Sequence, residues 1–229
     1  MTIINYSDPF ILWASARTAS SAFFYEYAAR NNSKVMPMNH EPLNLHGVRS
    51  NKLPPKGILG VVSSGYSFKC MINKETFAKH GRVGWELQKL KKALPVMDYR
   101  HIIIHRKDLY SRQKSYVFSQ TNNIWSKRDV FESKDFNGWM NLSKKEFRWK
   151  EEHAIEFEKE VLDRTVEMIK IFEEYDLPYQ IIEFEEACKY IGKDTSQGTK
   201  QYYGEWESSL VKEEILKLKD HEFYKNYAT

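Results

Sequence analysis

The sequence has few of the features that mark secreted, membrane-spanning or metal-binding proteins. It contains only two cysteines, Cys70 and Cys188, which form no C-x-x-C pair, so we expect two small buried side chains and no metal site. The longest apolar runs, such as residues 10–14 and 102–104, are far shorter than the roughly 20 residues of a membrane helix. The first residues lack a basic segment followed by an apolar one, so we predict a cytoplasmic protein without a secretory signal or an integral membrane segment.

Charge of one sign is not concentrated in any part of the chain. The 35 lysines and arginines are interleaved with 31 aspartates and glutamates, and because there is no long basic tract we predict no nucleic-acid partner. The net charge of +4 suits an anionic ligand. With 229 residues, 41% of them hydrophobic, the chain is long enough for one domain, residues 1–229, with a sizeable core.

Short apolar runs alternate with segments of helical spacing along the chain. The run 10–14 is continuous, as expected for a strand that is buried on both faces of a parallel sheet. We interpret the many Glu and Lys residues of the long helical segment 144–175 as a solvated face. The predicted strands are 10–14, 58–62, 68–72, 99–105 and 179–184, and the predicted helices are 22–30, 85–94, 109–120, 144–175, 185–191 and 208–219. This alternation predicts an α/β domain with a central, mostly parallel sheet flanked by helices.

A stretch of small and hydroxyl-bearing residues, 15–21, lies between the first predicted strand and the first predicted helix. Backbone N–H groups in such a turn, together with the positive end of the helix, can bind a phosphate group. Arg17 adds a forked cation, and Thr18, Ser20 and Ser21 add hydroxyl donors. The segment is not a G-x-x-x-x-G-K-[ST] loop, because its glycines and its lysine are absent. An ordinary helix with a Ser or Thr N-cap is the alternative interpretation.

A second candidate anion site follows the predicted strand 99–105. Arg106 stands where that strand ends, and ligands of open α/β sheets bind at the carboxyl ends of strands. Ser115 lies in the next predicted helix, and a guanidinium with a hydroxyl suits a phosphate monoester. The alternative is that Arg106 and Asp108 form a capping ion pair and that Ser115 has no role in binding.

The two segments, in this order, resemble the phosphate-binding motifs of PAPS-dependent sulfotransferases, most closely those of the bacterial trehalose 2-sulfotransferase type. The S-x-R-T-x-S-S segment is similar to the 5′-phosphosulfate loop of that family. The residues that match its 3′-phosphate motif are His105, Arg106, Asp108, Ser115 and Trp125. The resemblance implies a single P-loop-like domain with the sulfotransferase fold, and PAPS as the co-substrate with PAP as its product. It assigns the 3′-phosphate to Arg106 and Ser115, and the 5′-phosphosulfate to Arg17, Thr18, Ala19, Ser20 and Ser21.

Other segments match the family less closely. Residues 68–73 resemble a strand of the same group, and this would let Lys69 reach the sulfuryl group. Residues 198–206 resemble a loop that closes over the nucleotide, where Lys200 would contact the 3′-phosphate. The alternatives are a surface cation at a strand end for Lys69 and a solvated side chain for Lys200. The family often has glycine where this chain has Ala19.

The implied chemistry is an in-line displacement at sulfur, in which positioning and charge stabilisation dominate catalysis. We expect Arg17 and Lys69 to neutralise charge on the reacting groups, and we expect no metal to be needed. The acceptor hydroxyl needs a general base, and Asn44 stands where the family's glutamate base is expected. The candidates for the base are therefore Glu41, which we prefer, and otherwise His40 or His46.

Two other functions are compatible with the same patterns. A nucleotide-dependent kinase shares the strand–loop–helix arrangement, but the missing loop lysine and the pair Arg106 and Ser115 argue against it. A relative that binds a nucleotide without turnover is favoured by Asn44. For the acceptor, the resemblance implies a hydroxyl of a small molecule or a saccharide.

Overall fold

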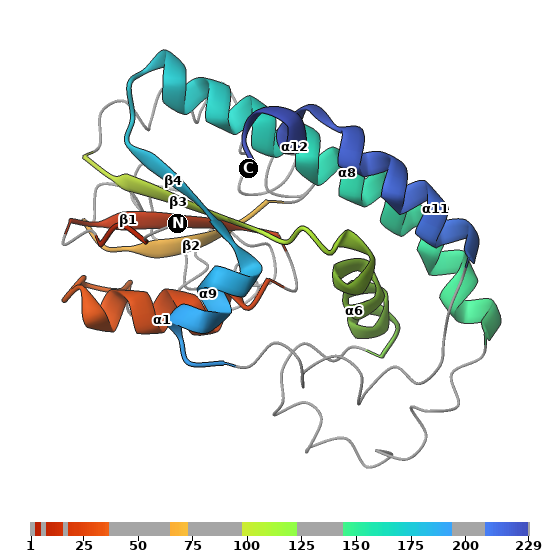
Figure 1. Cartoon of the computed structure of the whole chain (residues 1–229). Helices are drawn as coiled ribbons and strands as arrows, with labels where there is room; N and C mark the ends of the chain where they lie inside the picture. Colours follow the sequence, from red (N-terminus) through yellow and green to blue (C-terminus); the bar gives the residue numbers. More distant parts are fainter. Residues whose placement is uncertain are drawn as a thin grey trace, which may run out of the picture.

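The computed structural model describes seven parts of the chain, whose elements are drawn in Figure 1. These parts are residues 3–5, 8–15, 18–36, 65–72, 98–122, 144–193 and 209–228. They form an α/β fold in which helices flank a parallel sheet, as the sequence predicts. The predicted strand at 58–62 and the predicted helix at 85–94 lie outside the described residues.

Four parallel strands form the described sheet, in the order β2-β1-β3-β4. Their bounds are β1 Phe10–Ala14, β2 Phe68–Met71, β3 Arg100–His105 and β4 Tyr179–Glu183. Every residue of β1 is buried, because this strand has a neighbour on each side and an apolar layer on each face. The predicted positions of all four strands are confirmed to within one residue at each end.

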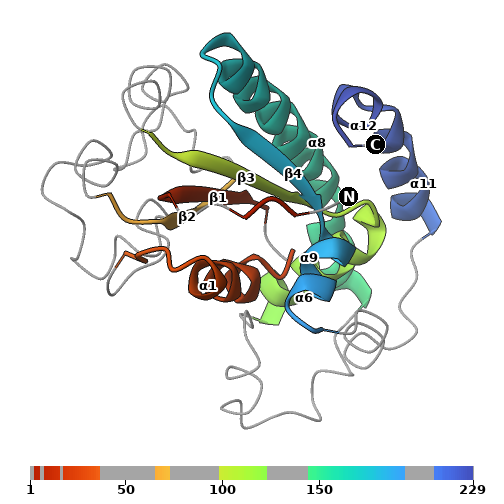
Figure 2. The ribbon, with the colours of Figure 1, turned by 60° about the vertical axis from the view of Figure 1, so that its left-hand side comes forward.

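The described helices are α1 Ser20–Arg30, α6 Leu109–Asn122, α8 Lys144–Glu174, α9 Phe184–Tyr190, α11 Ser209–Lys217 and α12 Glu222–Asn226, with a 3-10 helix η3 Leu218–Asp220. Helices α1 and α9 cover one face of the sheet and α8 and α12 cover the other (Figure 2), whereas α6 and α11 pack against α8. Leu12 of β1 packs in the layer of α1 and α9, whereas its neighbour Trp13 packs in the layer of α8 and α12. This alternation follows from the two-residue period of side chains along a strand. The same alternation determines toward which face of the sheet the side chain of each residue at a strand end points.

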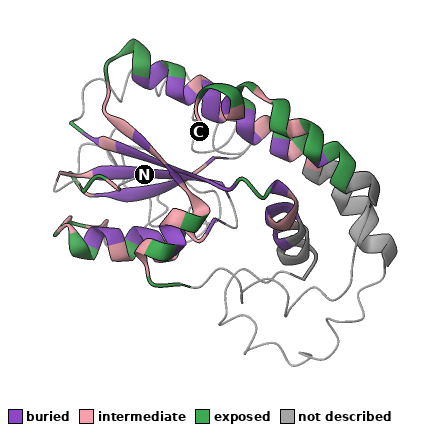
Figure 3. Cartoon of the chain, viewed as in Figure 1, coloured by how far each residue is buried: buried purple, intermediate pink, exposed green. Residues whose placement is uncertain are grey.

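The long helix α8 has one buried side, toward the sheet and α12, and one exposed side (Figure 3). Its spacing predicted this arrangement, and its observed bounds differ from the predicted ones by one residue. Helix α12, with five residues, was not predicted. Within the described residues, no helix combines the length and the apolarity needed to cross a membrane. Both cysteines are buried and free, as expected.

A buried histidine joins the sheet to α8. Trp13 Nε1 donates a hydrogen bond to His101 Nδ1 over 3.1 Å, and the imidazole stacks on Phe172 with ring centroids 4.3 Å apart. Burial, with a smaller effect of Arg100, lowers the pKa of His101 to about 3. The imidazole is therefore neutral at physiological pH, and its Nδ1 acts as an acceptor.

The start of the chain is fastened to the last strand of the described sheet. The backbone N–H of Ile4 donates to Gln180 Oε1 over 3.0 Å, and Gln180 Nε2 donates to the carbonyl of Ile4 over 2.8 Å. The hydroxyl of Tyr27 donates to the same carbonyl over 2.6 Å. These bonds tie residues near position 4 to β4 and α1 at once.

Candidate functional site

The two segments with predicted phosphate motifs leave the sheet side by side. Strands β1 and β3 are neighbours, and Ala14 is paired with Ile104, so the chain after each strand emerges at the same edge. From β1 the chain continues to β2 on one side, whereas from β3 it continues to β4 on the other. A reversal of this kind in the strand order creates a crevice at the carboxyl ends, where ligands of open α/β sheets bind.

The loop between β1 and α1 has a backbone conformation that is unusual for a residue with a side chain. Ala19 is the N-cap of α1 with φ 52° and ψ 16°, in the left-handed region, and no side chain caps the helix. The alternative of an ordinary Ser or Thr cap is therefore wrong. Helix α1 begins at Ser20, two residues earlier than predicted, so Ser20 and Ser21 lie in its first turn rather than in the loop. The first N–H groups of a helix have no acceptor within it and point to this edge.

Thr18 shapes the loop through its side chain. It is fully buried, and its hydroxyl donates to the carbonyl oxygen of Ser15 over 2.8 Å. The hydroxyl proton is thus committed to the loop itself, although the sequence suggested a donor to the ligand. Thr18 holds the turn that carries Ala19 and the first turn of α1.

Because Ala19 has a left-handed backbone, we expect glycine to change the stability of the protein differently at position 19 than at position 22 of α1. A left-handed residue with a Cβ costs roughly 1–2 kcal/mol, and glycine avoids this at an entropic cost of roughly 0.5–1 kcal/mol. We expect Ala19→Gly to leave the free energy of unfolding unchanged or to raise it by up to about 1.5 kcal/mol. Ala22→Gly, in the same helix, should lower it by about 1 kcal/mol. Urea unfolding compares the two, and an equal loss in both variants would contradict the role of the left-handed loop.

Lys69 reaches the first turn of α1 from β2. Its side chain is 3% exposed, and its Nζ lies 2.8 Å from Ser21 Oγ and 3.3 Å from Ser20 Oγ. The interpretation of Lys69 as a surface cation is therefore wrong. The charge of the ammonium group and the partial positive charge of the helix N-terminus lie close together here, and both stabilise an anion placed between them. The structure thus joins Lys69 to two predicted site residues, Ser20 and Ser21, that lie 49 and 48 positions away in the sequence.

Arg106 follows β3 directly and is 8% exposed. Its guanidinium carbon lies 4.3 Å from the centroid of the Phe184 ring, the first residue of α9, which orients the group by a cation–π contact. Lys69 and Arg106 therefore both contact the beginnings of helices that cover the same face of the sheet. Asp108 acts as the cap of α6, because its Oδ1 accepts the N–H of Ser111 over 3.0 Å.

Ser115 occupies a less accessible position than its predicted role suggests. It is 3% exposed and lies on α6, one turn beyond Arg112. A cavity of about 20 Å³ at the ends of β1 and β3 is lined by Arg106, Arg112 and Ser15, whereas Ser115 is not part of its lining. The volume is enough for one water molecule.

A buried ion pair that the sequence did not predict borders the same cavity. Arg112 of α6 pairs with Glu158 of α8, and both side chains are almost completely buried. Burial lowers the pKa of Arg112 to about 10, so the guanidinium keeps its charge at neutral pH. The interpretation of the charged residues of α8 as a solvated face is wrong for Glu158. Its position three residues before the core residue Val161 was the signal, because such spacing places both on one face.

The remaining candidate residues cannot be placed in this geometry. They lie outside the described part of the chain and are Arg17, His40, Glu41, Asn44, His46, Trp125 and Lys200. Within the described part, no group of three or more His, Cys, Asp or Glu side chains could hold a metal ion.

Comparison with known proteins adds no assignment to this geometry. No family model matches the chain, and no curated protein matches it.

Proposed function

We propose that the protein is a sulfotransferase, with the sulfotransferase fold, that moves a sulfuryl group from PAPS to a hydroxyl of a small-molecule or saccharide acceptor. The observation that carries the proposal is the pair of cationic groups, Lys69 and Arg106, on one face of the sheet at the crevice beside β1. Lys69 belongs to β2 and Arg106 follows β3, so β1 lies between their strands, and Lys69 is level with Ile102, four residues before Arg106. A nucleotide with phosphate groups on both its 5′ and its 3′ oxygen offers one anionic group to each of two such separate cations.

The residues around Lys69 and the residue Arg106 suit different groups of PAPS. The first turn of α1, with Ser20, Ser21 and Lys69, offers backbone and hydroxyl donors and a point charge for the 5′-phosphosulfate. Arg106 offers the planar, paired donors that favour a phosphate monoester, and it is assigned to the 3′-phosphate. The sequence resemblance assigns Ser115 to the 3′-phosphate together with Arg106. The backbone of Ala19 belongs to the proposed 5′-phosphosulfate site.

In the proposed reaction the acceptor oxygen attacks sulfur in line with the bond to the leaving phosphate oxygen. That bond breaks as the new O–S bond forms, PAP leaves, and a base takes the hydroxyl proton. The ammonium of Lys69 and the N-terminal end of α1 stabilise the negative charge that develops on the leaving oxygen. The candidates for the base are those named from the sequence, with Glu41 preferred.

Nucleotide affinity tests the proposal directly. We expect calorimetry to give tighter binding of adenosine 3′,5′-bisphosphate than of adenosine 5′-phosphate. Arg106→Ala should weaken the bisphosphate by about 10- to 100-fold, as expected for charge-assisted hydrogen bonds, and leave the monophosphate unchanged. Arg100→Ala is the matched control, because Arg100 lies at the opposite end of β3, where it pairs with Asp8.

The alternatives give different results in the same experiments. Unchanged affinity for the bisphosphate in Arg106→Ala would remove this residue from the nucleotide site. Preference for ATP with Mg²⁺ over the bisphosphate would indicate a kinase. Binding of the bisphosphate without transfer of sulfate from PAPS to any member of a saccharide and alcohol panel would indicate a non-catalytic relative.

A further inference from the structure

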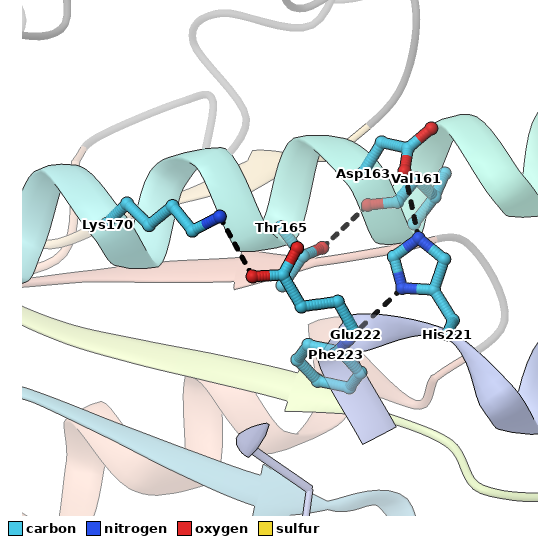
Figure 4. Close-up of polar contacts among 7 residues, drawn as sticks. All are labelled: Val161, Asp163, Thr165, Lys170, His221, Glu222 and Phe223. Carbon is cyan, nitrogen blue, oxygen red and sulfur yellow. Dashed lines mark hydrogen bonds and ion pairs between the residues drawn. The ribbon is translucent and has the colours of Figure 1, made fainter. Parts of the chain in front are cut away.

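The segment 221–228 packs across α8 and reaches the end of β3 (Figure 4). His221 Nε2 lies 2.8 Å from Asp163 Oδ1, and its Nδ1 accepts the N–H of Phe223 over 3.1 Å. A neutral imidazole with its proton on Nε2 satisfies both contacts. Lys170 pairs with Glu222 over 2.8 Å, so α12 is held to α8 at two points.

Two aromatic residues of this segment contact the strand end that carries Arg106. Phe223 is fully buried, and its ring centroid lies 5.2 Å from that of His105 in an edge-on arrangement. The ring of Tyr224 lies 6.3 Å from the same imidazole. Both aromatic residues also line the cavity that Arg106 and Arg112 border. Helix α12 therefore forms one wall of the region behind the proposed 3′-phosphate site.

Tyr224 also contacts the backbone of Arg106 directly, through its hydroxyl group. It donates to the carbonyl oxygen of Arg106 over 3.4 Å. The ladder between β3 and β4 ends at the pair His105 and Glu183, so Arg106 lies just beyond the regular sheet. Burial raises the pKa of Tyr224 well above its usual value, against an opposing effect of Arg112, and the hydroxyl keeps its proton at neutral pH.

We infer that Tyr224 is a positioning residue for Arg106, and that α12 thereby contributes to selectivity for nucleotides with a 3′-phosphate. The inference rests on the proposed function. Its physical basis is that the direction of a guanidinium depends on the backbone that carries it. Phe184 orients the side chain from α9, while Tyr224 holds the carbonyl from α12. A small displacement at the strand end would reduce the paired contacts of Arg106 with a phosphate.

The test uses two tyrosines of the same segment. Tyr224→Phe removes the hydroxyl and keeps the ring, and it should raise the Kd of adenosine 3′,5′-bisphosphate about three- to ten-fold, the range expected for one hydrogen bond. The Kd of adenosine 5′-phosphate should not change. Tyr227→Phe is the control, because Tyr227 packs against the core and the structure gives it no contact with Arg106.

The outcomes separate the inference from the proposed function. If the wild-type protein binds the two nucleotides equally, the proposed function fails. If the wild-type protein prefers the bisphosphate and Tyr224→Phe keeps the same ratio of affinities, the inference is overturned while the proposed function stands. An equal loss for both nucleotides in Tyr224→Phe, or an equal effect of Tyr227→Phe, would also overturn it, because either result indicates a structural role alone.

Discussion

Replacing Lys69 by methionine is expected to lower kcat for the proposed sulfuryl transfer by about 100- to 1,000-fold, the usual effect of removing one group that stabilises charge in the transition state. Methionine keeps much of the length and the buried apolar stem of the side chain, so the packing of β2 is retained. What is lost is the ammonium group at the first turn of α1. Steady-state kinetics with PAPS measure the change, and KM for PAPS should rise much less than kcat falls.

Lys34→Met is the matched control for this substitution. Lys34 is exposed and precedes the isolated bridge between Val35 and Ser67, at the start of the segment that leads into β2. Its replacement should leave kcat unchanged. Wild-type kcat in Lys69→Met would show that its contacts with Ser20 and Ser21 serve only the fold.

Acidification from pH 7 to pH 5 is expected to lower the free energy of unfolding by about 4 kcal/mol through two histidines. The pKa of His101 is lowered to about 3, mainly by burial, and that of His105 to about 4, also mainly by burial. Below pH 6.5 the unfolded chain binds protons at both imidazoles, whereas the folded chain stays neutral there. Each histidine therefore removes about 1.4 kcal/mol per pH unit as the pH falls, until its folded pKa is reached.

The environment of His105 includes charges of both signs, and burial outweighs them. Glu183 and Glu186 raise the pKa of His105, whereas Lys107 lowers it. Urea unfolding at pH 7 and pH 5 measures the loss of stability. In His101→Gln, where an amide oxygen replaces the acceptor for Trp13, the pH dependence should fall by about half. A pH dependence equal to that of the wild type would contradict the neutral state of His101.

The sequence predicted the strands well because buried parallel strands are continuous apolar runs with polar ends. The two segments with the candidate anion motifs follow the ends of β1 and β3, as the sequence predicted, while their role in anion binding stays a prediction. The start of α1 was placed two residues late, because serine is favoured both in loops and at helix starts. Helix α12 was missed, because five residues are too few for a periodic signal.

The contacts within the candidate site depend on pairs of residues that no local pattern connects. Lys69 and Ser20 are 49 positions apart, and only the pairing of β2 with β1 brings them together. Glu158 and Arg112 are charged residues, which are rarely buried, so a prediction from composition places both at the surface. Tyr224 could not be connected with Arg106 because the contact spans 118 positions.

The hydrogen bonds between Gln180 and Ile4 have a consequence for folding during synthesis on the ribosome. Strand β1 is synthesised early, yet its neighbour β3 follows some ninety positions later, and Gln180 meets Ile4 across 176 positions. Contacts between residues so far apart in the sequence form only after long loops have closed, which slows their formation. A nascent chain whose residues 221–228 are still inside the ribosome lacks the wall that Phe223 and Tyr224 form behind Arg106, so this strand end reaches its final packing only after that segment has emerged.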